Sequence, residues 1–232
     1  MGEDIHKLIN WYDTKAMKKI MPVQDDYDYS KTGIKPNSRI LNVGTTGSGK
    51  TQALLHYIQL SPNCFSRIIV FYKESEYMYE LLNKSLKNQV EFHDNLKDLP
   101  RLKDLRKDME ENERILLVLD DWMLELKNFP NVNDYLIYGR KKNITLFCLS
   151  QDYYRIPKVL RNQMTYLLLF KMVQKKDVNL ILSEYDNKEK ELLPIYKKIV
   201  SVPLQFMKIE TVCGDEKKKI SRNFTDYIDF SA

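Results

Sequence analysis

The chain has 232 residues, of which 43% are hydrophobic and 30% are charged, and its formal net charge is +5. This length suffices for one α/β domain with a sizeable core and is marginal for two. No apolar run approaches the 18 residues of a membrane-spanning helix, and the N-terminus lacks a secretory signal, so we expect neither a membrane nor a secreted protein. The charge is compatible with nucleic acid but does not indicate it. The isolated cysteines Cys64, Cys148 and Cys213 indicate a reducing compartment, with no disulfide framework and no zinc site.

Residues 1–37 are predicted to form an N-terminal arm, and residues 38–232 the main domain. The arm has apolar residues from Leu8 to Met17 that fit a short amphipathic helix, followed by a turn over 31–36. We expect this arm to pack on its own domain. Docking of the arm on a neighbouring subunit is the alternative.

The stretch 39–51 has the strongest local pattern of the chain. A short apolar run predicts one buried strand, a glycine-rich segment follows that fits G-x-x-x-x-G-K-[ST], and apolar residues at helical spacing come next. In such a loop, successive backbone N–H groups and the positive end of the helix dipole bind phosphate. The residues predicted to bind the nucleotide are Gly44, Thr45, Thr46, Gly47, Ser48, Gly49, Lys50 and Thr51. A glycine-rich turn before a helix is the alternative interpretation.

Within this loop, two side chains have predicted roles in phosphate chemistry. Lys50 would reach the β- and γ-phosphates of ATP, and the hydroxyl of Thr51 would hold Mg²⁺. The sequence therefore predicts ATP and Mg²⁺ as cofactors.

Beyond the loop, strands and helices are predicted in alternation. Strands are expected at 67–72, 90–93, 115–119, 144–149, 166–170, 204–212 and 228–230. Helices are expected at 76–86, 99–110, 132–139, 156–161, 176–183 and 188–200. The runs at 115–119 and 144–149 are continuously apolar, as is typical of strands buried on both faces. This alternation predicts an α/β fold with a mostly parallel sheet and helices on both faces.

Polar side chains end two of the buried strands. Asp120 and Asp121 follow the strand at 115–119, and Gln151 follows the strand at 144–149. Because ligands collect at the carboxyl ends of parallel strands, these side chains are expected beside the phosphate loop. Asp120 is predicted to hold Mg²⁺ through its carboxylate. Asp121 is predicted to be the base that activates the attacking water, and Gln151 is predicted to sense the γ-phosphate. The alternative for Asp120 and Asp121 is a pair of solvent-exposed acids in a turn, and the alternative for Gln151 is a polar cap at the end of its strand.

The spacing of these motifs resembles that of the FtsK–HerA superfamily of motor ATPases. Within it, the chain is most similar to the genome-packaging ATPases of large eukaryotic DNA viruses, poxviruses and virophages. The matching stretches are 39–51, 115–122 and 140–170, whereas residues 1–30 and those beyond about 175 match weakly or not at all. The resemblance implies a P-loop NTPase fold of the RecA-like ASCE type.

The resemblance also implies roles for single residues. Lys50 and Thr51 match the Walker A pair, Asp120 matches the Walker B aspartate, and Gln151 matches the polar sensor. Asp121 stands where the superfamily usually has Glu, and a shorter acid must lie closer to the water that it polarises.

Arg140 lies at a position where members of this family have an arginine finger. The resemblance implies that Arg140 acts on the nucleotide of a neighbouring subunit. Lys141 and Lys142 follow it, so a basic surface turn is the alternative. Arg155 and Arg161 are the rival candidates for the finger.

The function that the resemblance implies is an ATP-hydrolysing double-stranded DNA translocase that packages a viral genome into its capsid. Its implied partners are double-stranded DNA, further copies of itself in a homo-oligomeric ring, and capsid or portal components, with no membrane. It would be virus-encoded and intracellular, in the host cytoplasm or a viral factory, or associated with the virion. Candidate DNA contacts are Lys171, Lys175, Lys176, Lys217, Lys218, Lys219 and Arg222.

Two other functions remain open on the sequence alone. A small-substrate P-loop kinase usually has an arginine-rich lid, which we do not find, and a GTPase would need an Asn-Lys-x-Asp motif, which does not occur. A nucleotide-gated assembly protein, in which ATP only orders a ring, is the non-enzymatic alternative.

Overall fold

The computed structural model describes residues 14–15, 27–107, 109–110, 112–123, 125–185, 189–213 and 215–228. Most of the predicted N-terminal arm, including nearly all of its predicted amphipathic helix, lies outside these residues. The described end of the arm packs on the domain, since Thr32 and Ile34 are buried.

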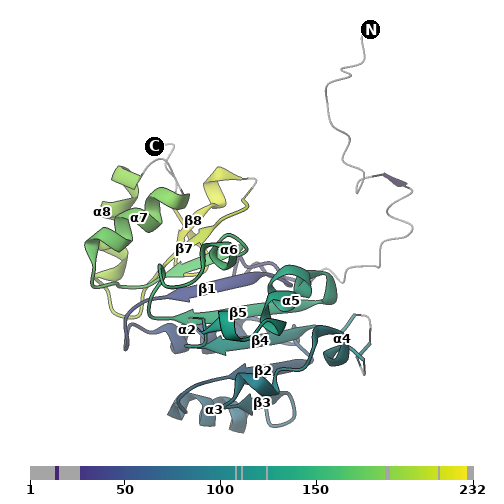
Figure 1. Ribbon diagram of the computed structural model, residues 1–232. Helices are drawn as coiled ribbons and strands as arrows, with labels where there is room; N and C mark the ends of the chain where they lie inside the picture. Colours follow the sequence, from purple (N-terminus) through teal and green to yellow (C-terminus); the bar gives the residue numbers. More distant parts are fainter. Residues whose placement is uncertain are drawn as a thin grey trace.

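One sheet of nine strands organises the described residues (Figure 1). The strands are β1 (Arg39–Val43), β2 (Arg67–Phe71), β3 (Val90–His93), β4 (Ile115–Asp120), β5 (Ile144–Ser150), β6 (Tyr166–Leu169), β7 (Met207–Glu210), β8 (Ile220–Arg222) and β9 (Asp226–Tyr227). Their order is β3-β2-β4-β5-β1-β6-β7-β8-β9. Neighbouring strands from β3 to β6 are parallel, whereas β7, β8 and β9 add antiparallel pairs at one end. The predicted α/β fold with a mostly parallel sheet is confirmed.

Helices connect the parallel strands. The α-helices are α2 (Lys50–Leu60), α3 (Tyr77–Ser85), α4 (Leu102–Leu105), α5 (Asn131–Tyr138), α6 (Lys158–Arg161), α7 (Lys175–Tyr185) and α8 (Glu189–Val200). The 3-10 turns are η2 (Leu96–Asp98), η3 (Leu126–Asn128), η4 (Gly139–Lys142) and η5 (Glu216–Lys218).

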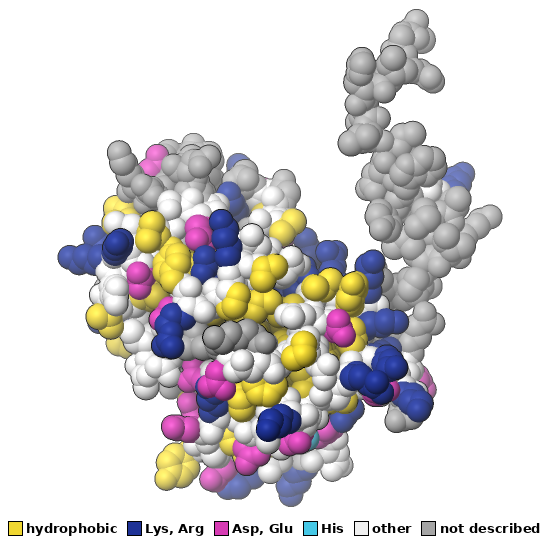
Figure 2. Space-filling view, viewed as in Figure 1, with side chains coloured by type: hydrophobic (Ala, Val, Ile, Leu, Met, Phe, Trp, Pro, Cys, Tyr) yellow, Lys and Arg dark blue, Asp and Glu magenta, His cyan; other side chains and the backbone are white. Residues whose placement is uncertain are grey.

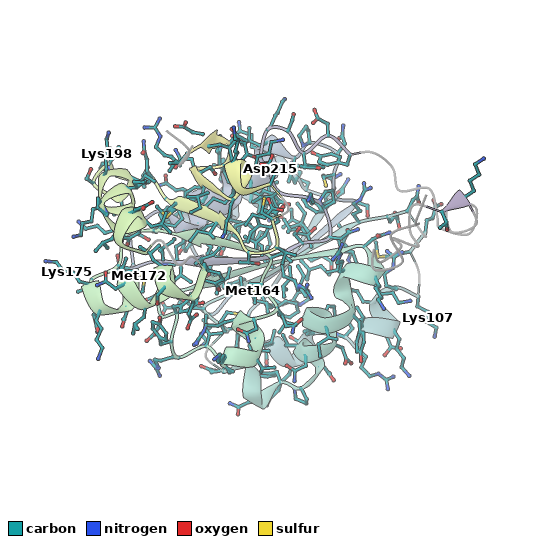
Figure 3. All side chains as sticks on the ribbon, turned by 90° about the horizontal axis from the view of Figure 1, so that it is seen from above. Lys107, Met164, Met172, Lys175, Lys198 and Asp215 are labelled. Carbon is teal, nitrogen blue, oxygen red and sulfur yellow. The ribbon has the colours of Figure 1, made fainter. Side chains whose placement is uncertain are left out.

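The apolar residues of the central strands divide between two cores, one on each face of the sheet. Successive side chains of a strand point to opposite faces, so Ile40 enters one core and Leu41 the other. Helices α2 and α3 cover the core that contains Ile40, and α4 to α8 cover the core that contains Leu41. Figure 3, which is turned by 90° from Figure 1, shows this layering of helices on both sides of the sheet. Burial on both faces explains why the central strands are apolar without alternation.

The register of the three central strands brings their carboxyl ends to one edge. Val43 at the end of β1 is paired with Ser150 at the end of β5, and Asp120 at the end of β4 is paired with Leu149. The residues that follow these strands therefore meet at the carboxyl edge of the sheet.

Three predicted elements differ from the structure, and one observed strand was not predicted. The strand predicted over 204–212 is shortened to β7, and the positive φ of Leu204, 65°, is incompatible with an extended strand. Of the helix predicted over 99–110, only the four residues of α4 are formed, and the 3-10 turn η2 precedes this range. Leu99 is extended because it precedes Pro100, which disfavours the helical conformation. The three-residue strand β8 was not predicted, since lysines precede it and it is short. The last described strand is Asp226–Tyr227 rather than 228–230, and residues 229–230 lie outside the described part of the chain.

Lys208 on β7 joins the end of the predicted arm to the antiparallel strands. It is 0% exposed, and its Nζ donates to the backbone carbonyl oxygens of Thr32, Gly33 and Phe224. The ring of Tyr227 lies 5.1 Å from the same nitrogen. Burial lowers the pKa of Lys208 from its ordinary value of 10.5 to about 8.

This lowered pKa predicts a pH-dependent stability. Between pH 8 and 10.5 the unfolded chain binds the Lys208 proton more strongly than the folded chain does, so the contribution of Lys208 to stability rises with pH. Below pH 8 Lys208 is charged in both states, and the free-energy cost of burying that charge in the folded chain is fully present. The free energy of unfolding of the wild type minus that of Lys208→Met should rise by about 2 kcal/mol from about pH 7.5 to about pH 9.5, as measured by urea denaturation. Taking the difference cancels the titration of tyrosines and cysteines, and a difference that does not change with pH would contradict the prediction.

Candidate nucleotide-binding site

The loop between β1 and α2 is held against the ends of both neighbouring strands. The N–H of Gly44 donates to the carbonyl of Ser150 at the end of β5, at 3.2 Å. The N–H of Thr45 donates to the carbonyl of Lys171, just beyond β6, at 3.1 Å. The loop is therefore fixed from both sides before α2 begins at Lys50.

Two glycines of this loop are required by its packing and conformation. A Cβ at Gly44 would lie 2.5 Å from the Cβ of Phe170 and 2.7 Å from the Oγ of Ser48. Gly49 caps α2 with a φ of 109°, and a Cβ there would meet Leu204 at 3.0 Å. The Oγ of Ser48 is buried and has no hydrogen-bond partner. At Gly44 and Gly49 the main chain therefore packs too closely against its neighbours to admit a side chain without rearrangement.

Lys50 points back over the loop. It is buried, and its Nζ donates to the carbonyl oxygens of Gly44 at 2.9 Å and Thr45 at 3.1 Å. Burial lowers the pKa of Lys50, whereas the charges of Asp121 and Asp120 act to raise it. A phosphate bound over the loop would add the negative charge that this buried ammonium lacks.

Thr51 and Asp120 are the predicted magnesium ligands, and both side chains are buried. The hydroxyl of Tyr79 on α3 donates to Oδ2 of Asp120 at 2.5 Å. Burial raises the pKa of Asp120 to about 6, and the hydrogen bond from Tyr79 opposes this rise. Asp120 is therefore ionised at neutral pH. A hydroxyl and a carboxylate are both oxygen ligands of the kind that Mg²⁺ prefers.

Among the described residues, no group of three or more His, Cys, Asp or Glu could hold a metal. A cation at Thr51 and Asp120 would therefore need further oxygen ligands from a nucleotide or from water.

Asp121, Gln151 and Thr46 form a chain of hydrogen bonds at the carboxyl edge. Gln151 Nε2 donates to Asp121 Oδ2 at 2.9 Å, and the Thr46 hydroxyl donates to Gln151 Oε1 at 2.9 Å. Asp121 has a φ of 58°, a left-handed conformation that turns the chain sharply after β4. The structure thus brings the second acid, the glutamine and the phosphate loop together, as the sequence predicted for their positions.

The candidate arginine fingers lie in three different places. Arg140 is exposed in η4, which precedes β5, so it lies at the amino edge of the sheet and away from the loop of its own chain. Arg155 is exposed in the turn after β5. Arg161 is buried, donates to the carbonyl oxygens of Tyr154 and Ile156, and is paired with Glu184. These internal contacts indicate that Arg161 stabilises the fold of its own chain.

The basic residues predicted to contact DNA form two separate groups. Lys171 follows β6 and contacts the loop through its carbonyl, and Lys175 and Lys176 begin α7; all three side chains are exposed. Lys217 and Lys218 are exposed in η5, and Arg222 on β8 is paired with Asp226. Their contact with DNA stays a prediction.

Sequence reasoning missed two residues that hold the site together. Tyr79 left no signal, because its contact with Asp120 spans two distant elements. Asn42 did leave one, as the single polar residue of an otherwise apolar run. It is buried, and its Nδ2 donates to the carbonyl of Lys50 at 3.0 Å, which fixes the start of α2 to β1.

The strand order, the glycine loop at the end of β1 and the acids at the end of β4 define the chain as a P-loop NTPase. A family model described as "Poxvirus A32 protein" matches residues 26–209. The chain belongs to this family, which confirms the resemblance seen in the sequence. No curated protein matches this sequence.

Solved structures share the fold. The genome packaging NTPase B204 of Sulfolobus turreted icosahedral virus 2, in complex with ATP-gammaS, is 18% identical with a TM-score of 0.58, over 82% of this chain and 98% of that one. B204, the DNA-packaging ATPase of Sulfolobus Turreted Icosahedral Virus, is 16% identical with the same TM-score and coverage. The cytoplasmic domain of the Type VII secretion ATPase EccC of Thermomonospora curvata is 15% identical with a TM-score of 0.54, over 84% of this chain and 26% of that one.

In the part of the chain that the structure describes, no helix combines the length and the apolar character needed to cross a membrane.

Alanine substitutions at Gly47 and Gly49 should distinguish the cost of a positive φ from the cost of steric contact between the new Cβ and its neighbours. Gly47 has a φ of 72° and open space around its Cβ position, so Gly47→Ala should cost about 1 kcal/mol and retain ATP binding. Gly49→Ala adds contact with Leu204 and Phe170 to its positive φ and should cost about 2 to 3 kcal/mol and weaken ATP binding. Urea denaturation and calorimetric titration measure both effects. Equal losses for the two variants would contradict the crowding at Gly49.

Proposed function

We propose that the protein hydrolyses ATP with Mg²⁺ and uses the energy to move double-stranded DNA into a viral capsid. Membership of the Poxvirus A32 protein family supports this function. Two similar structures carry the same activity in their descriptions, a genome packaging NTPase and a DNA-packaging ATPase.

The observation that carries the proposal is the hydrogen-bond chain from Asp121 through Gln151 to Thr46. A nucleotide-binding turn alone would need neither the acid nor the amide. A carboxylate that is hydrogen-bonded through an amide to the phosphate loop can orient a water for attack on the γ-phosphate. The same hydrogen bonds can rearrange when that phosphate leaves. This arrangement favours hydrolysis over binding alone.

Each site residue then has one task. The glycine-rich loop and the ammonium of Lys50 would bind the phosphates. Thr51 and Asp120 would hold Mg²⁺, which would neutralise charge on the phosphate oxygens. Asp121 accepts a proton from the attacking water, and Gln151 orients that water.

A ring of identical subunits would complete this site. Arg140 lies at the edge of the sheet opposite to the loop, so it can serve only the nucleotide of another copy. Ile137 and Tyr138, on the helix just before it, are each 51% exposed. Figure 2 shows hydrophobic and basic side chains intermixed on the face that carries α5. An exposed apolar surface beside a charged residue suits a head-to-tail contact between copies.

DNA-stimulated hydrolysis is the direct test of the proposal. Double-stranded DNA should raise ATP turnover of the wild type, and Asp121→Asn should lower turnover by about 10²-fold or more while ATP binding persists, because only the base is lost. Asp94→Asn, which makes the same change in charge after the outer strand β3, is the control and should behave as the wild type does.

The two alternative functions have distinct signatures in this assay. A rate indifferent to DNA but raised by a nucleoside would indicate a small-substrate kinase. Binding without turnover would indicate a nucleotide-gated assembly protein.

Mixing two inactive variants should reveal a finger that acts in trans. Arg140→Ala leaves its own site intact but lacks the finger, and Asp121→Asn retains the finger but lacks the base. In rings of equal parts, about a quarter of sites would pair an intact site with an intact finger, so about a quarter of wild-type turnover should return. Lys141→Ala, at the adjacent basic residue, should remain active alone. A mixture that stays inactive would argue against Arg140 and direct attention to Arg155.

A further inference from the structure

The tyrosine that contacts Asp120 is held firmly inside the fold. Tyr79 lies in the first turn of α3 and is 3% exposed, and its ring packs against the rings of Tyr72 at 5.9 Å and Phe92 at 5.7 Å. Tyr72 is itself joined to β3, because its N–H donates to the carbonyl of His93 at 3.0 Å. The hydroxyl of Tyr79 therefore has little freedom to move away from Asp120.

The start of α3 also adds negative charge to the surroundings of Asp120. Glu76, the residue before α3, is half-buried, and its carbonyl accepts from the N–H of Tyr79 at 2.9 Å. Burial is the main cause that raises the pKa of Asp120, and the charges of Asp121 and Glu76 add to this rise. A divalent cation beside Asp120 would offset the repulsion among these carboxylates.

The hydrogen bond from Tyr79 engages one of the two carboxylate oxygens of Asp120. The hydroxyl donates to Oδ2 at 2.5 Å, a length typical of a hydrogen bond from a hydroxyl to a carboxylate. Oδ1 is then the oxygen that remains for a cation or for water bound to it. Mg²⁺ requires near-ideal octahedral geometry with few protein ligands, whereas Ca²⁺ accepts both oxygens of one carboxylate in a more flexible shell. A carboxylate with one oxygen engaged therefore suits Mg²⁺ better than Ca²⁺.

We propose that Tyr79 is a positioning residue for the metal site, which leaves only one carboxylate oxygen of Asp120 available to the cation and thereby favours Mg²⁺ over Ca²⁺. The proposal rests on the use of ATP and Mg²⁺ proposed above and adds the residue that selects the cation. Tyr79 contacts neither the nucleotide nor the cation in this account and acts only through Asp120. The alternative is that its hydroxyl only satisfies a buried carboxylate as part of the fold.

Calorimetric titration with AMPPCP, an analogue of ATP that is not hydrolysed, tests the proposal without turnover. The titrations are made in EDTA, in excess Mg²⁺ and in excess Ca²⁺. The wild type should bind the analogue more tightly with Mg²⁺ than with Ca²⁺. Tyr79→Phe, which retains the ring and its packing, should lower this preference about tenfold and leave binding in EDTA unchanged, because loss of a hydrogen bond to a metal ligand typically costs about 10- to 100-fold in metal affinity.

The matched control is Tyr135→Phe, which removes the hydroxyl of another buried tyrosine. The hydroxyl of Tyr135 donates to the carbonyl of Pro100 at 2.8 Å, and Tyr135 belongs to the core on the other face of the sheet from Tyr79. This variant should retain the wild-type preference for Mg²⁺.

Three results would overturn the proposal. The first is a wild type that binds the analogue equally well with the two cations. The second is a wild-type preference in Tyr79→Phe, even with a lower midpoint of urea denaturation, which would leave the hydroxyl with a structural role only. The third is an equal loss of binding in all three solutions, which would indicate damage to the phosphate loop.

A double-mutant cycle tests whether Tyr79 acts through Asp120. Asp120→Asn removes the charge of the predicted ligand and should by itself lower the preference for Mg²⁺. Tyr79→Phe added to Asp120→Asn should then cause no further change, because the group through which the hydroxyl acts is already altered. Independent effects that add would contradict the proposal.

The outcome is separable from that of the proposed function. A protein whose preference for Mg²⁺ depends on Tyr79 but which never hydrolyses ATP would retain the assignment and contradict the motor. Hydrolysis stimulated by DNA, with an unchanged preference in Tyr79→Phe, would do the reverse.

Discussion

The close packing of the phosphate loop between β5 and β6 is the constraint on which the site depends. Gly44 has no room for a side chain against Phe170, and the N–H groups of Gly44 and Thr45 are bound to carbonyls of the two neighbouring strands. The loop conformation is therefore imposed by the sheet rather than by the loop alone. Any phosphate bound there is held by a main chain that has little freedom to rearrange, which is the condition for electrostatic preorganisation.

Charge balance explains the side chains around this loop. Lys50 and Asp120 are both buried, and each is costly as an isolated charge. Lys50 is partly compensated by carbonyls and nearby acids, and Asp120 by the hydroxyl of Tyr79. A nucleotide with its cation would supply the missing charge to both. The two buried charges therefore fit the proposed binding of ATP together with Mg²⁺.

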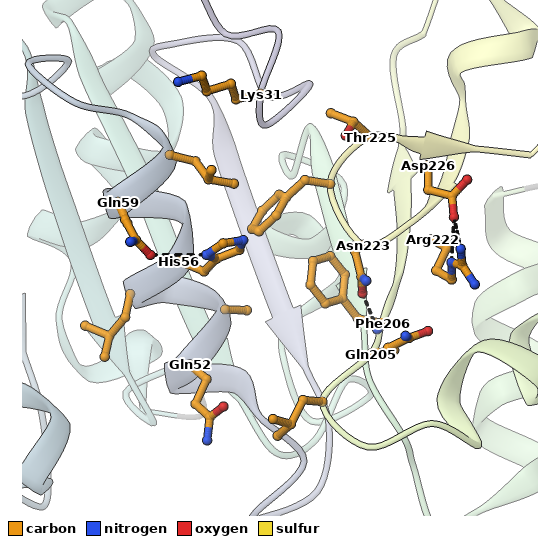
Figure 4. A pocket seen from close by; sticks show the side chains of 15 residues that line it. Lys31, Gln52, His56, Gln59, Gln205, Phe206, Arg222, Asn223, Thr225 and Asp226 are labelled. Carbon is orange, nitrogen blue, oxygen red and sulfur yellow. Dashed lines mark hydrogen bonds and ion pairs between the residues drawn. The ribbon is translucent and has the colours of Figure 1, made fainter.

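The predicted site residues lie at two opposite edges of the sheet. The carboxyl edge gathers the loop, the acids and Gln151, while Arg140 lies at the amino edge, where it cannot contact the nucleotide of its own chain. This separation is consistent with the proposed ring, in which Arg140 of a second copy would contact the nucleotide. The antiparallel strands have a separate effect. The chain that enters them places Leu204 beside the loop and lines one side of a pocket along α2 (Figure 4).

The sequence by itself determined the parallel core and the phosphate loop. Both arise from local patterns, since apolar runs predict buried strands and glycines at fixed spacing predict the anion-binding turn. It also placed Asp120, Asp121 and Gln151 at strand ends, where parallel strands must bring them to one edge. Only the tertiary structure decided the contacts of Tyr79 and Leu204, the internal role of Arg161, and the antiparallel extension of the sheet. These depend on contacts between residues far apart in the chain, for which no local periodicity carries a signal.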